Sequence, residues 1–84
     1  MFSGGLGETV ETAVILNTPH SQEGIAAESE FISRRCGERN KDWKKRGQAL
    51  IWNNDKPFDL VTVELCDGKT RDFYFDISRF FGKP

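Results

Sequence analysis

The chain lacks the features that mark a membrane protein, a secreted scaffold or a zinc site. It holds no apolar run of about eighteen residues, and it begins with neither the basic start nor the apolar stretch of a signal peptide. Cys36 and Cys66 stand far apart without a C-x-x-C pattern, which favours two buried free thiols. We therefore expect a cytoplasmic protein without a membrane partner.

Histidine is scarce as well. His20 is the only one, so a Ser-His-Asp triad would depend on it alone. It stands beside Ser21 at an expected helix start, where adjacent side chains point apart, and the sequence places no carboxylate to orient its ring. We interpret His20 as a solvated residue. No other catalytic, metal, nucleotide or cofactor motif stands out, so no cofactor is predicted.

The net charge of −1 is small, but the charges are unevenly distributed. Residues 1–33 carry five acidic side chains and no lysine or arginine, whereas residues 34–46 carry seven bases and two acids. Segregation of this kind can fix the pairing of subunits or attract an acidic partner. The predicted ligand-binding or partner-binding residues are Arg34, Arg35, Arg39, Trp43, Lys44, Lys45 and Arg46.

The same basic segment also suggests an alternative function. Trp43 stands among cations, and a nucleic-acid base can stack on an aromatic ring while phosphates meet lysine and arginine. Against this stand a pI near 5.8, the acidic segment before it and the lack of an RNA-binding signature. Nucleic-acid binding is therefore the second hypothesis rather than the first.

The length of the chain bounds its architecture. Eighty-four residues form one domain, 1–84, which is near the size at which a single core gives only a few kcal/mol of net stability. Residues 1–8 are glycine-rich and are expected to form a flexible leader. Because the core is small, we expect a homo-oligomer, with a dimer favoured.

The clearest pattern lies between Phe58 and Ile77, where apolar residues alternate with polar ones on either side of Cys66-Asp67-Gly68. A three-residue loop with Gly68 at positive φ would pair Val63 with Arg71. A two-residue loop would instead pair Glu64 with Arg71, but it would scatter the apolar residues over both faces. The first register places one apolar face on the core: Val61, Val63, Leu65, Phe73, Phe75 and Ile77.

The remaining elements follow from shorter signals. Residues 10–17 favour a first strand, with a helical start as the alternative, and Thr18 and Pro19 resemble an N-cap and first helical residue. The helix is predicted to run to about Cys36, with Gly37 as its stop. Its expected apolar face consists of one stripe with a second pair beside it, namely Ile25, Ile32 and Cys36 with Ala27 and Phe31.

Residues 38–46 are polar and lie between two glycines, so they are interpreted as a loop, with a helical turn at Asp42 and Trp43 as an option. Residues 48–52 form the next expected strand. Residues 53–57 form a turn in which Pro57 precedes the first paired residue of the long hairpin. The fold class is thus α+β, one helix packed on a mainly antiparallel sheet of three to four strands, in the order β-α-β-β-β.

Two further groups of residues are candidate sites. Asp72, Asp76 and Glu64 share the polar face of the hairpin, where neighbouring carboxylates could act as an acid and a base, but an exposed sheet face keeps them solvated. The second group is an apolar patch, predicted as an interface: Phe58, Leu60, Tyr74, Phe80 and Phe81. The alternative for Phe80 and Phe81 is that the C-terminal turn folds back and buries them.

Three fragments, Glu23-Gly24-Ile25, Asp42-Trp43 and residues 74–78, resemble small uncharacterised bacterial proteins of the kind that integron gene cassettes encode. This resemblance implies no shared activity and transfers no functional residue. The function expected from the sequence is a small oligomeric binding module that recognises a protein, an acidic partner or a small ligand. Nucleic-acid binding comes second, and a small enzyme with a carboxylate site comes third.

Overall fold

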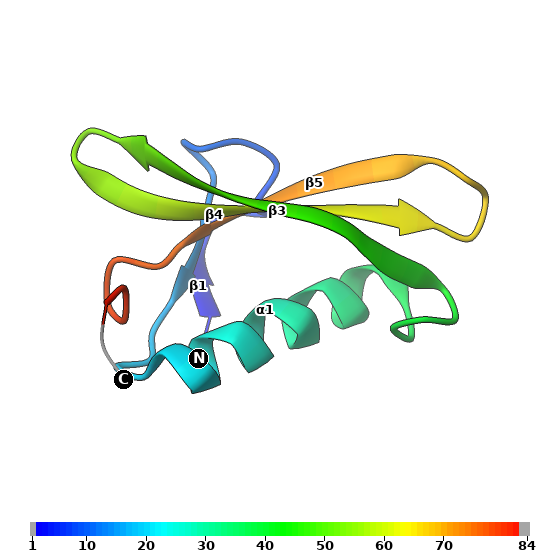
Figure 1. Cartoon of the computed structure of the whole chain (residues 1–84), viewed down its shortest axis with the longest axis horizontal. Coiled ribbons are helices and arrows are strands. Elements are labelled where there is room, and N and C mark those ends of the chain that lie inside the picture. Colours follow the sequence, from blue (N-terminus) through cyan, green and yellow to red (C-terminus); the bar gives the residue numbers. More distant parts are fainter. Residues whose placement is uncertain (1, 83–84) are drawn as a thin grey trace.

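The computed structural model describes residues 2–82 and shows one helix on one face of a five-stranded sheet (Figure 1). Along the sheet the strands lie in the order β1-β2-β5-β4-β3, and only the β2–β5 pair is parallel. From β2 onward the chain order is β-α-β-β-β, which confirms the predicted α+β fold. The elements are β1 (Phe2–Gly4), β2 (Val14–Leu16), α1 (Ser21–Cys36), β3 (Trp43–Asn53), β4 (Lys56–Leu65) and β5 (Thr70–Asp76).

The β4–β5 hairpin has the predicted register. Val63 lies opposite Arg71 and Val61 opposite Phe73. Gly68 has a φ of 86°, and its N–H donates to the carbonyl of Leu65 at 2.9 Å, which closes the three-residue loop. The inward face is therefore the predicted one. Both cysteines are free thiols, but Cys66 is exposed in this loop and Cys36 is half-buried, so the expectation of two buried thiols is wrong.

Strand β3 begins at Trp43, which corrects the interpretation of residues 38–46 as a loop. The Trp43 ring is buried in the core, and this anchors the following residues beside the end of β4, where Lys44 lies opposite Glu64. The register shifts between Lys45 and Gly47, which leaves Arg46 as a bulge. The polar composition therefore did not indicate this strand. Its position depends on the buried ring of Trp43 and on the opposite charges of Lys44 and Glu64 across the two strands.

A tight turn joins β3 to β4. Asn54 and Asp55 both have positive φ, 51° and 62°, as a two-residue hairpin of the I′ type requires. Pro57 lies inside β4 opposite Trp52, so the expectation that it precedes the paired residues is wrong. Proline is tolerated here because its nitrogen, which has no hydrogen to donate, faces the place where β5 has ended at Asp76. Its carbonyl still accepts a hydrogen bond from the N–H of Ile77 at 3.3 Å.

The N-terminal part is less regular than predicted. Of residues 10–17, only Val14–Leu16 form a strand, and residues 9–12 form a turn closed by bonds between Thr9 and Thr12. Part of the expected leader pairs with β2 as β1, while Met1 lies outside the described residues. The helix starts at Ser21 rather than at Pro19. The hydroxyl of Thr18 donates to Glu23 at 2.9 Å instead of capping the first turn.

Four of the five predicted apolar residues of α1 pack on the core, and Ile25 does not. Ala27 and Ile32 are buried and Phe31 makes edge contacts with Phe73 and Phe75, whereas Ile25 is 56% exposed. The reason is Gly24, where an added Cβ would lie 2.3 Å from the ring of Phe80. Close packing at Gly24 turns the next residue outward. Gly37, with a φ of 106°, ends the helix as predicted.

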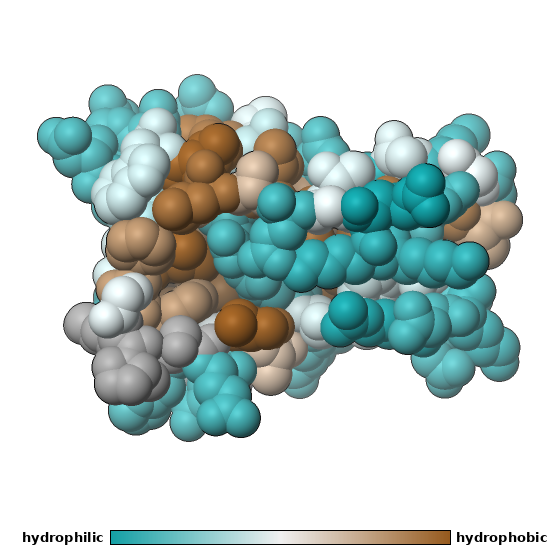
Figure 2. Space-filling view, viewed as in Figure 1, coloured by the Kyte–Doolittle hydropathy of each residue, from teal (hydrophilic) through white to brown (hydrophobic). Residues whose placement is uncertain are grey.

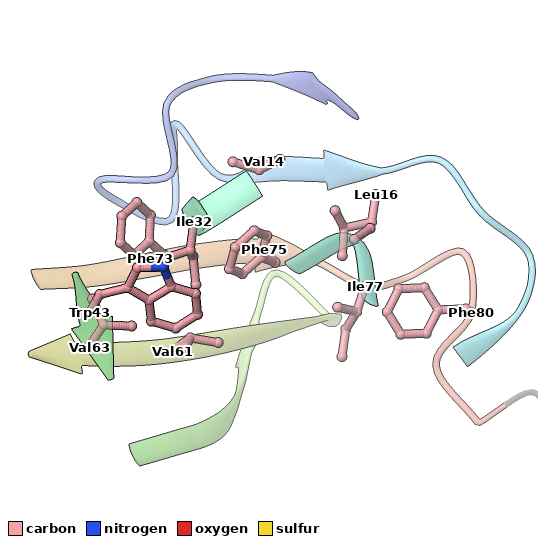
Figure 3. Packing of buried hydrophobic residues seen from close by; sticks show 11 residues of the cluster. Val14, Leu16, Ile32, Trp43, Val61, Val63, Phe73, Phe75, Ile77 and Phe80 are labelled. Carbon is pink, nitrogen blue, oxygen red and sulfur yellow. The ribbon is translucent and has the colours of Figure 1, made fainter. Parts of the chain in front are cut away.

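The core lies between α1 and the inward face of the sheet (Figure 3). Trp43 lies at one end, and Ile77 and Phe80 lie at the other. The C-terminal turn folds back because the N–H groups of Phe80 and Phe81 both donate to the carbonyl of Ile77. Phe80 is therefore 4% exposed, so the alternative in which this turn buries its aromatic residues holds for Phe80 alone.

Candidate functional site

Strand β3 forms one edge of the sheet. It is last in the strand order, and among residues 2–82 its one strand partner is β4, apart from an isolated bridge between Trp43 and Arg39. The N–H of Leu65 donates to Lys69, and the N–H of Ile77 donates to Pro57, so odd-numbered residues of β4 bond β5 and even-numbered residues bond β3. By the same alternation, the backbone groups that β3 directs away from the sheet after the bulge belong to Gln48, Leu50 and Trp52.

Three exposed apolar side chains gather beside this edge. Leu50 is 47% exposed, Trp52 58% and Phe81 40%, and the rings of Trp52 and Phe81 meet edge to face with centroids 5.3 Å apart. We call Leu50, Trp52 and Phe81 the edge cluster. In Figure 2 the hydrophobic surface gathers at the end of the molecule that carries the β3–β4 hairpin, while the opposite end is mostly hydrophilic. The edge cluster lies on the helix side of the sheet, where α1 does not cover β3.

The structure separates the predicted interface residues. Phe58 and Phe80 are buried within the chain, at 6% and 4% exposure, and Leu60 and Tyr74 are half-buried on the face away from the helix. Only Phe81 belongs to the edge cluster. Sequence reasoning missed Leu50 and Trp52, although their alternate positions in the predicted strand already placed them on one face.

The predicted basic site is also divided. Arg34 pairs with Glu30 at 3.1 Å on the helix, and Arg46 pairs with Glu64 at 3.4 Å on the sheet. Arg39 donates to the hydroxyl of Ser29 at 3.1 Å, and Arg35 lies 6.0 Å from the centre of the Phe31 ring. The cations therefore lie on α1, on the loop after it and on β3, and several already have partners within the chain.

Trp43 serves the fold rather than a surface. It is 2% exposed, and its indole N–H donates to the carbonyl of Gly37 at 2.9 Å. The guanidinium of Arg39 covers the ring at 5.6 Å from its centre. A nucleic-acid base cannot reach this ring in the folded chain.

A buried pair of carboxyl groups lies between α1 and β4. Glu28 and Asp59 are 4% and 8% exposed, and they share a hydrogen bond. Burial, the bond to Asp59 and the negative charge of Asp59 raise the pKa of Glu28 to about 9, against a smaller lowering by Lys45. Glu28 is therefore protonated at neutral pH. Its Oε2 has no hydrogen-bond partner among the described residues.

The amide of Gln48 extends this pair to the edge strand. Its nitrogen donates to Asp59 at 3.0 Å, and its oxygen accepts from the ammonium of Lys45. Sequence reasoning missed this group, though a signal was present: Asp59 continues the inward period of Val61 and Val63, and Glu28 lies four residues after Gly24 on the buried side of the helix. Glu28 and Asp59 line neither the surface hollow at the start of β3 nor the one beside Pro19 and Arg79.

The outer carboxylates do not form one site. Asp72 accepts from the hydroxyl of Thr62 at 2.8 Å, and Glu64 pairs with Arg46. Asp76 accepts from both the N–H and the hydroxyl of Ser78. Burial raises the pKa of Asp76, but these bonds and the charge of Lys56 outweigh it, so the pKa lies below its usual range. Asp76 thus fixes the chain after β5.

Two of the surface hollows among the described residues are shallow. One of about 300 Å³ lies between the start of β3 and the β4–β5 loop and is lined in part by Lys41, Lys44, Glu64 and Cys66. The other lies beside Pro19 and Arg79. Within residues 2–82, no cluster of three or more His, Cys, Asp and Glu could hold a metal ion. Over the same residues, no helix is both long enough and apolar enough to cross a bilayer.

Comparisons with protein-family models, with curated proteins and with solved structures found no match to this chain. The resemblance to integron cassette proteins therefore stays a prediction.

Proposed function

We propose that this chain is a small self-associating binding module that takes a protein partner, or a small ligand, at the edge cluster. The observation that carries this proposal is the exposure of Leu50, Trp52 and Phe81 beside the unpaired edge of β3. Tryptophan is enriched among the residues that dominate binding energy, and a contiguous apolar patch marks interaction sites on small proteins. A cytoplasmic location is part of the proposal, since two free thiols suit a reducing compartment.

The size of the chain supports self-association. A single domain of 84 residues buries a small core, and covering further apolar surface in an oligomer adds to its stability. The edge cluster supplies such a surface without disturbing the core, because its side chains are already outside.

Sedimentation velocity over about 5 to about 200 µM protein tests the proposal. The wild-type mass should rise from monomer towards dimer, and the double variant Trp52→Ser, Phe81→Ser should stay a monomer. Ile25→Ser is the matched control, because Ile25 is 56% exposed, as Trp52 is at 58%, but lies on α1 outside the cluster. A wild type that is monomeric at every concentration would contradict the proposal.

Nucleic-acid binding is the alternative, and the burial of Trp43 removes the stacking ring on which it depended. A titration with fluorescent single-stranded RNA separates the two. We expect that no salt-sensitive binding of the RNA is detected between about 50 and about 200 mM salt. Micromolar, salt-sensitive binding that disappears when Lys44, Lys45 and Arg46 are replaced would favour the alternative.

A further inference from the structure

The two halves of β3 differ in how well they protect the open edge against pairing with another strand. Natural edge strands are protected by lysines, bulges and charged side chains, which discourage pairing with another strand. Residues 44–46 carry three cations and the bulge, whereas residues 48–53 carry neither a charge nor a proline. The second half is also the half that bears Leu50 and Trp52. The edge is therefore open where its side chains are apolar.

We propose that the partner of this edge is a second copy of the chain, whose β3 pairs antiparallel with the first β3 about a two-fold axis at Leu50. This inference rests on the proposed function, because it names the partner of the same surface.

The backbone pattern selects the register. Gln48, Leu50 and Trp52 direct their N–H and C=O groups outward, and an antiparallel pair bonds most fully where outward residues face one another. Centring on Leu50 places Leu50 opposite its own counterpart and Gln48 opposite Trp52, so every outward residue after the bulge finds a partner. Centring on Ile51 would place Gln48 opposite the Asn54 turn, which cannot continue a strand.

The side chains fit this arrangement. A two-fold axis perpendicular to the sheet keeps both helices on one side, and the exposure of Leu50 and Trp52 shows that α1 leaves room over β3. The two Leu50 side chains then meet at the axis, with Trp52 and Phe81 of each copy flanking them. The two exposed clusters then cover one another at the axis, with Gln48 of each copy beside Trp52 of the other.

The charges agree as well. The antiparallel register brings the basic residues 44–46 of each copy alongside the Asn54-Asp55 turn of the other, so cations approach the carboxylate of Asp55. A parallel arrangement would instead place the two basic halves side by side and repel. Charge thus favours the same orientation that the backbone selects.

Two substitutions at one position test the pairing. Leu50→Thr removes the apolar side chain but keeps the outward N–H, whereas Leu50→Pro also removes the N–H. Since that N–H faces away from β4, proline costs the β3–β4 ladder no bond. By sedimentation, Leu50→Thr should weaken the dimer about tenfold, and Leu50→Pro should weaken it at least about a hundredfold. Circular dichroism and urea unfolding check that both variants fold.

Each outcome has a distinct meaning. A Leu50→Pro variant that dimerises like the wild type overturns the edge pairing while the proposed function stands. Equal loss in both variants also overturns it, because the side chain and not the backbone would then carry association. A wild type that never dimerises overturns both. If Leu50→Pro fails to fold, a mixed isotope-labelled wild-type sample decides: contacts between the amides of Gln48 and Trp52 of different copies are expected, and their absence from a dimer overturns the pairing.

Discussion

Among single residues, Glu28 has the strongest influence on how the free energy of unfolding depends on pH. Its pKa is about 9 in the folded chain and has an ordinary value of 4.5, so between these values the folded state holds a proton that the unfolded state has lost. The raised pKa therefore contributes stability that is fully present below pH 4.5 and is lost as pH rises towards 9. Asp76, with a lowered pKa, titrates below this range.

Glu28→Gln removes this titration while it keeps the size of the side chain and a donor for Asp59. We expect the variant to gain stability over the wild type as pH rises from 5 to 9, by at most about 1.4 kcal/mol per pH unit. Urea unfolding at each pH, at low protein concentration, measures the difference. A difference that does not change with pH would show that Glu28 is ionised in the folded chain.

The glycine of the β4–β5 loop offers a second test at this scale. Gly68 has a φ of 86° and nothing within 4 Å of an added Cβ, so its cost of substitution is conformational rather than steric. Gly68→Val should reduce the free energy of unfolding by about 1 kcal/mol or more. Gly47 is the control, because it has equal space but no positive φ, and Gly47→Ala should change stability by no more than about 0.5 kcal/mol. Equal effects at both positions would contradict this explanation.

At the scale of elements, the start of β3 depends on Trp43. Its ring is buried against the core and its N–H is bonded to Gly37, so the ring joins the end of α1 to the edge strand. Trp43→Ala should therefore cost about 3 to 5 kcal/mol of stability. Thermal unfolding measures this. A variant as stable as the wild type would mean that the Trp43 ring is not part of the core. The ring would then again be a candidate for a binding surface.

The elements also show what the sequence could reveal. The β4–β5 hairpin was predictable to the residue because its alternation, its glycine and its loop length agree on one register. The first half of β3 was not, since residues 44–46 are charged and their strand conformation comes from the tertiary burial of Trp43. The helix face was predicted correctly except at Ile25, which is exposed because the neighbouring Gly24 makes the close contact with Phe80.

At the scale of the whole molecule, the candidate site emerged only when distant segments came together. Leu50 and Trp52 could be placed on one face from their spacing, but Phe81 joins them because the C-terminal turn folds back over Ile77. In the same way, the Glu28–Asp59 pair needs the helix to cross β4. Local patterns predict elements, whereas contacts between segments far apart in sequence depend on packing that no local pattern encodes.

The central claim is that the chain self-associates through the open edge of β3. Hydrogen exchange measured at several protein concentrations tests this claim most directly. We predict that the outward amides of Gln48, Leu50 and Trp52 become protected as protein concentration rises from about 5 to about 200 µM, as mass action requires. The inward amides of Ala49 and Ile51 bond β4 and should be protected at every concentration. Outward amides that exchange freely throughout this range would contradict the account.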